Sequence, residues 1–121
     1  MTISEALQRF DALYPNAFEE EEKIRWLSTL DWTIKVEIID TRRSDVSFHG
    51  YNAETDQETK LLAEAPYDEM YLFWMQAMMD YHNGEMAGYN NSMAKFDDLY
   101  TKFRNWYNRE NMVKGTAIKY W

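Results

Sequence analysis

The sequence contains no cysteine and is poor in histidine, glycine and proline. With no cysteine among its 121 residues, the chain can form neither a disulfide framework nor a thiolate metal site. The two histidines, His49 and His82, have no partner at the spacing of a known metal-binding pattern. The four glycines form no phosphate-binding loop, and no serine lies in a nucleophile-elbow motif. Nothing in the sequence therefore argues for an enzyme, although catalytic carboxylates need no local motif, and we expect no cofactor, metal or small-molecule substrate.

The sequence also lacks an excess of basic residues and any long apolar run. Its formal net charge of −8 argues against duplex DNA or an anionic membrane as the main partner. The most apolar stretch, residues 71–79, is broken by Gln76 and is bracketed by Asp68, Glu69 and Asp80. A membrane-spanning helix needs about 20 apolar residues, so this stretch predicts a buried helix instead. No secretory signal opens the sequence, and we expect the protein to remain in the cytoplasm.

The acidic residues are unevenly distributed along the chain. Residues 1–70 carry 16 acidic and seven basic side chains, whereas residues 71–121 carry five and six. The imbalance is either ordinary variation between solvated helix faces or a polarity that suits head-to-tail packing of copies.

What the sequence has in quantity is apolar, aromatic and methionine residues in helical periodicity. Hydrophobic residues make up 45% of the chain, enough for the core of one domain. Four helices are predicted, opening at Thr2, at Asn16, at Pro66 and after a turn at Gly84. The last two helices are expected to pack antiparallel along an aromatic seam with heptad spacing: Tyr89, Met93, Phe96, Tyr100, Phe103 and Tyr107.

Two features lie outside this helical pattern, and one acidic residue lies within it. Asp31 lies beside the apolar stripe of the second helix, so we expect it to be buried and bonded to a partner on another helix. Residues 43–65 are predicted to form a long projecting loop or a small β-hairpin. Residues 114–121 are predicted to form a C-terminal arm that either docks on its own domain or adds to a neighbouring chain.

The predicted fold is an all-α bundle of about four helices, with one helical domain at 1–113 and the arm at 114–121.

Three stretches of the chain resemble, in order and spacing, a known family. They are SEALQRFDALYPNAFEEEEKIRWLSTLD, LLAEAPYDEMYLFWMQAMMDYHNGE and YNNSMAKFDDLYTKFRNWYNR, which together cover most of residues 4–109. This arrangement resembles small structural proteins of tailed phages and prophages of Gram-positive bacteria, of the head–tail connector (head-completion adaptor) type.

The resemblance implies a non-enzymatic subunit that assembles as a ring under the phage portal. Such a subunit helps to join head to tail and to retain packaged DNA. Its partners would be copies of itself and phage portal and tail proteins, and DNA would be only a passing cargo. It would occupy the bacterial host cytoplasm during assembly and the virion afterwards. We expect Phe48, Tyr51, Tyr120 and Trp121 to anchor these interfaces, because aromatic residues dominate interface hot spots.

Two other functions fit the same sequence. A phage assembly chaperone would hold one partner protein and be absent from finished particles. A ligand-binding helical bundle would use the interior rich in methionine and aromatic residues as a pocket.

Overall fold

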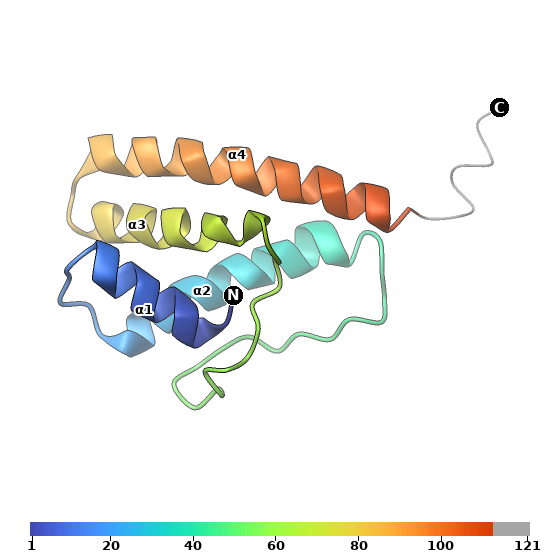
Figure 1. The fold of residues 1–121 in the computed structure, drawn as a ribbon, viewed down its shortest axis with the longest axis horizontal. Helices are drawn as coiled ribbons and strands as arrows, with labels where there is room; N and C mark the ends of the chain where they lie inside the picture. Colours follow the sequence, from blue (N-terminus) through green and yellow to red (C-terminus); the bar gives the residue numbers. More distant parts are fainter. Residues whose placement is uncertain (113–121) are drawn as a thin grey trace.

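The computed structural model describes residues 1–112, and these residues form an all-α bundle, as predicted (Figure 1). The predicted C-terminal arm at 114–121 lies outside the described residues. Two short helices, η1 and η2, flank the long connection between α2 and α3. The bounds of the elements are α1 Ile3–Leu13, α2 Glu20–Ile34, η1 Lys35–Ile39, η2 Tyr67–Glu69, α3 Met70–His82 and α4 Met86–Glu110.

Helix α1 begins where the sequence predicts. The Thr2 hydroxyl accepts a hydrogen bond from the Glu5 amide at 3.1 Å, which satisfies one of the free amides of the first turn. The buried face of α1 consists of residues at helical spacing: Ile3, Ala6, Leu7 and Phe10. The helix ends at Leu13, just before Pro15.

Helix α2 begins later than predicted, because Asn16 does not cap it. The helix starts at Glu20, and the Asn16 side-chain oxygen instead accepts the Phe18 amide at 3.1 Å within the connecting turn. Asparagine readily forms such local bonds, which compete with helix capping. At its other end, α2 continues into η1, a single turn of π-helix.

Helices α3 and α4 form an antiparallel pair that lies side by side along the bundle (Figure 1). The turn between them contains Gly84 at φ +74°, a conformation that glycine adopts without steric cost. Phe96 and Phe103 of the predicted seam are buried in α4, and its other four residues are half-buried. The seam is therefore a core seam. Helix α3 is covered on several sides, since its buried residues are Met70, Tyr71, Leu72, Met75, Ala77 and Asp80.

The connection between η1 and η2 is a loop, and the β-hairpin alternative is wrong for the described residues. The only β-type pairing among them is an isolated bridge between Thr2 and Lys60. The amides of Ile3 and Ser4 donate to the carbonyls of Thr59 and Gln57 at 3.0 and 2.9 Å, so the start of α1 supplies the partners that a second strand would have supplied. The loop therefore returns to the bundle and is anchored there.

No helix within residues 1–112 is both long enough and apolar enough to cross a membrane. The apolar run at 71–79 lies within α3, which has 13 residues.

Replacing Thr2 with alanine should destabilise the fold by about 1 kcal/mol, because the Glu5 amide loses its acceptor. Chemical denaturation monitored by circular dichroism measures this loss. Thr2→Ser keeps the hydroxyl and is the matched control. Equal stability of the alanine and serine variants would contradict a capping role.

Candidate functional site

The polar centre of the molecule is the fully buried carboxylate of Asp31 on α2. One of its oxygens accepts the Tyr71 hydroxyl of α3 at 2.6 Å. The other accepts the Tyr51 hydroxyl at 2.5 Å and the Leu62 amide at 3.0 Å, both from the loop. The Tyr71 hydroxyl in turn accepts the Ala63 amide at 2.8 Å. The prediction that Asp31 is buried with a partner from another helix is confirmed, and the network ties two stretches of the loop to α2 and α3.

The electrostatics of this network favour a structural role. Burial raises the pKa of Asp31, although its three donors act in the opposite direction. Burial, together with the adjacent carboxylate, also raises the pKa of the Tyr51 and Tyr71 hydroxyls. Both phenols therefore keep their protons at neutral pH and serve as hydrogen-bond donors. No buried side-chain nitrogen or oxygen atom within residues 1–112 lacks a hydrogen-bond partner, and the network holds the loop against α2 and α3.

An exposed apolar surface lies next to this network. Trp32 of α2 and Val36 of η1 are 43% and 60% exposed. The half-buried Phe48 ring packs edge-on against Trp32, with 4.9 Å between ring centroids, and against Tyr51 at 5.1 Å. We name the surface formed by Trp32, Val36 and Phe48 the apolar surface. Trp32, Thr33, Val36 and Glu37 line a shallow depression of about 360 Å³ that is widely open to solvent, on one face of the continuous α2–η1 helix.

Gly50 allows the loop to approach this surface closely. Its φ is +80°, and a Cβ atom built there would lie 2.8 Å from the Trp32 indole nitrogen and 3.2 Å from the Ser28 hydroxyl. The next residue, Tyr51, donates its amide to the Ser28 hydroxyl at 3.0 Å. Any larger residue at position 50 would displace Trp32, so the backbone of the loop positions the exposed ring.

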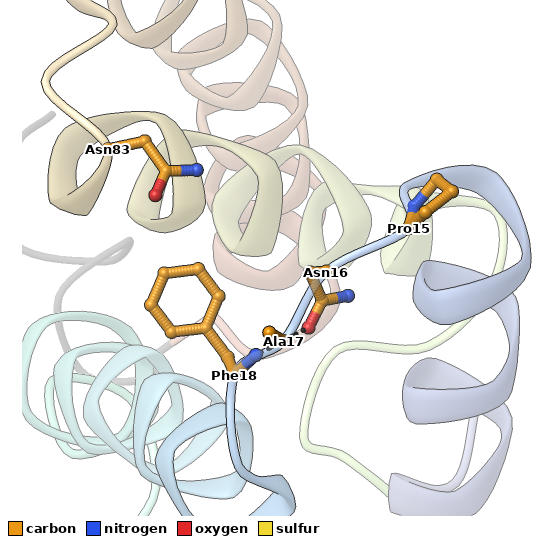
Figure 2. Close-up of a pocket in the computed structure, with 5 residues that line it drawn as sticks. All are labelled: Pro15, Asn16, Ala17, Phe18 and Asn83. Carbon is orange, nitrogen blue, oxygen red and sulfur yellow. Dashed lines mark hydrogen bonds between the residues drawn. The ribbon is translucent and has the colours of Figure 1, made fainter.

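A second hollow, of about 230 Å³, lies between the α1–α2 turn and the end of α3 (Figure 2). Its lining is uncharged: Pro15, Asn16, Ala17, Phe18 and Asn83. The Asn16 amide nitrogen is already bonded to the Tyr14 carbonyl at 2.8 Å and to Asp11 at 3.0 Å. The side chain best placed to select a ligand is therefore used within its own turn.

Metal-binding chemistry is not assembled by the described residues. No group of three or more histidine, aspartate or glutamate residues within residues 1–112 is arranged to hold a metal ion. His82 stacks on Trp26, with ring centroids 5.9 Å apart and planes inclined by 13°, and His49 is exposed in the loop.

Of the four residues predicted as interface anchors, the structure brings Phe48 and Tyr51 together. Tyr51 has its hydroxyl bonded inward to Asp31, so its polar end supports the loop. Tyr120 and Trp121 lie outside the described residues. The sequence analysis missed Trp32 and Val36. Their signal is two large apolar residues four positions apart, one on α2 and one on η1, both off the buried stripe of this continuous helix.

Comparisons with protein-family models, curated proteins and solved structures find no match for this chain.

Replacing Tyr71 with phenylalanine should lower the free energy of unfolding by about 2–3 kcal/mol. The change removes a donor to Asp31 and leaves the Ala63 amide without its acceptor in the interior. Urea denaturation measures the loss. Tyr81→Phe, at a side chain that is 56% exposed, is the matched control and should be neutral. Equal effects of the two substitutions would contradict the importance of the network.

Replacing Gly50 with alanine should destabilise the protein more than replacing Gly84. Both residues have positive φ, which costs alanine roughly 1 kcal/mol. Only at Gly50 would the added Cβ collide with neighbours, because nothing lies within 4 Å of that position at Gly84. Overpacking adds about 1–3 kcal/mol. Thermal unfolding of both variants tests the difference, and an equal loss would show that the loop can yield at Trp32.

Proposed function

We propose that this chain is a non-enzymatic structural protein of a tailed phage or prophage of Gram-positive bacteria. In this proposal it is a head–tail connector subunit, which assembles as a ring under the portal and helps to join head to tail and to retain packaged DNA. The sequence resemblance over most of residues 4–109 is the origin of the proposal. The structural observation that supports it best is the apolar surface of Trp32, Val36 and Phe48.

The apolar surface has the composition and the rigidity expected of a protein interface. Aromatic residues are enriched at interface centres, and a partner that covers Trp32 and Phe48 removes both from water. The Asp31 network anchors Tyr51, whose ring packs on Phe48, and Gly50 lets the loop lie close to Trp32. A preorganised surface loses less conformational entropy on binding.

The charge distribution also suits a ring around DNA. A ring requires two different faces of each subunit to meet, and residues 1–70 are strongly acidic whereas residues 71–121 are nearly neutral. Acidic residues facing a channel would not hold the phosphates of passing DNA. In this proposal the protein functions first in the host cytoplasm and then in the virion.

The proposal predicts closed rings of one stoichiometry in native mass spectrometry of a concentration series, confirmed by negative-stain imaging. If the chain alone stays monomeric, the same measurement is repeated with the phage portal protein present. A monomer under both conditions would contradict the connector function. A stable one-to-one complex with another phage protein that is absent from particles would identify an assembly chaperone instead.

Two variants test which residues hold the ring. Deleting residues 114–121 should abolish rings while leaving a folded monomer. Phe48→Ala should raise the concentration needed for assembly roughly tenfold, since interface aromatic residues contribute about 1–2 kcal/mol or more. Tyr81→Ala removes another exposed aromatic residue, at the C-terminal end of α3, and should have no effect. Assembly unchanged by the deletion would remove the C-terminal arm from the interface.

A further inference from the structure

We propose that Asp80 and Glu85 form a proton-sensitive latch at the turn between α3 and α4. Uptake of a proton by this carboxylate pair tightens the turn, and release of the proton loosens it. The inference concerns the folded subunit and does not rest on the connector function. It is carried by the burial of Asp80, by its lack of a hydrogen-bond donor, and by the like charge beside it.

Asp80 is a nearly buried carboxylate in the last turn of α3. Only 9% of the residue is exposed. Its Oδ2 atom lies against Gly88 in the first turn of α4, where an added Cβ atom would come within 2.6 Å of it. Glycine at position 88 therefore leaves the space that the carboxylate fills between the two helices.

The Asp80 carboxylate has no partner within residues 1–112. The other two buried charged residues there are both compensated, because Lys23 pairs with Asp11 at 2.7 Å and Asp31 has three donors. Asp80 accepts no hydrogen bond, and no side chain caps the start of α4. Withdrawing a carboxylate from water without supplying a donor disfavours its charged form.

Glu85 places a second negative charge beside Asp80. Its amide donates to the Asp80 carbonyl at 2.8 Å, so the backbone of the turn fixes the distance between the two residues. Burial raises the pKa of Asp80, and the charge of Glu85 raises it further. The folded turn therefore binds a proton more readily than an exposed aspartate does.

The other titratable groups around Asp80 face other partners. Lys95, the first basic residue of α4, lies over an aromatic ring of α3. His82 stacks on Trp26 of α2, with ring centroids 5.9 Å apart, and Tyr89 of α4 packs on the neighbouring tyrosine of α3. Within residues 1–112, Glu85 is the charged side chain that shifts the Asp80 pKa.

The direction of the shift determines how the latch responds to pH. The folded pKa of Asp80 lies above the ordinary value of 3.8, so between these two values the folded protein binds more protons than the unfolded chain. Its stability therefore falls as the pH rises through that window. The stabilisation is complete below the ordinary pKa and is lost above the raised one. The turn is tight in acidic solution and loosened at neutral pH.

The latch lies where large apolar side chains are exposed. Tyr81 and Met86 flank the turn and are 56% and 50% exposed. Their relative position depends on how tightly the end of α3 is joined to the start of α4. The latch thereby couples pH to the shape of this end of the bundle.

Asp80→Asn tests the inference, because it removes the charge and keeps the size of the side chain. The unfolding midpoint of the full-length chain is measured by circular dichroism from about pH 4.5 to about pH 7.5, a range that starts just above the ordinary aspartate pKa. Carbon NMR of the side-chain carboxyl gives the pKa of Asp80 directly. Hydrogen exchange of the Gly84 and Glu85 amides, which bond to carbonyls of α3, reports how tightly the turn is held.

The matched control is Asp98→Asn. Asp98 is also an aspartate of the α3–α4 pair, but its side chain is 62% exposed and is paired with Lys102 at 3.0 Å. Because the chain carries a net charge of −8, removing any acidic side chain relieves some general repulsion. The control measures that general effect. A further variant, Glu85→Gln, removes the neighbouring charge and leaves Asp80 in place.

We expect Asp80→Asn to raise the midpoint at pH 7.5 by at least about 2 °C, and the gain should shrink as the pH falls to about 4.5. Protection of the Gly84 and Glu85 amides at pH 7.5 should increase at least about threefold. Asp98→Asn should produce neither change, and Glu85→Gln should lower the pKa of the Asp80 carboxyl. An unchanged midpoint at pH 7.5, an equal gain in the Asp98 variant, or an Asp80 carboxyl that titrates at or below its ordinary pKa would each overturn the inference. Ring formation is measured separately by native mass spectrometry, so failure of one proposal does not imply failure of the other.

Discussion

The buried carboxylate of Asp31 is the interaction on which the rest of the structure depends. An ionised group without hydrogen bonds would be very costly in the interior, and Asp31 has three donors, from α3 and from the loop. The requirement is mutual. The amides of Leu62 and Ala63 lie at buried or half-buried positions of the loop, and their acceptors are Asp31 and the Tyr71 hydroxyl. The loop is held against α2 and α3 because Asp31 needs donors from the loop and the loop amides need acceptors from the helices.

The same network connects the core to the surface. The Tyr51 hydroxyl is bonded to Asp31 while its ring packs on Phe48, and Phe48 packs on Trp32. The internal carboxylate is thereby linked, through Tyr51, to the half-buried Phe48 ring and the exposed Trp32 ring. The connector proposal uses this surface. Among residues 1–112, Trp32 and Val36 stay exposed on this surface.

Sequence reasoning succeeded wherever the determining contacts are local. The capping hydroxyl of Thr2, the turn at Gly84 and the seam of α4 follow from spacing within a few residues, and the structure contains all three. It failed at Asn16, where capping of α2 competes with a local bond in the preceding turn. The Asn16 side-chain oxygen accepts the Phe18 amide in that turn and does not cap the helix. The hairpin prediction failed for a different reason. Residues 57–61 find their backbone partners at residues 1–4, across more than 50 positions of chain.

The sequence by itself determined the all-α class, the place of most helices, the burial of Asp31 and the absence of cysteine chemistry. Periodicity and composition are properties of the chain read in order, so these features need no three-dimensional information. Only the tertiary structure decided which groups satisfy Asp31, because Tyr51 and Tyr71 lie 20 and 40 positions away from it. It also decided that Phe48 joins Trp32 and Val36 in one surface. A residue is exposed only relative to what packs around it, and that packing is a property of the folded chain.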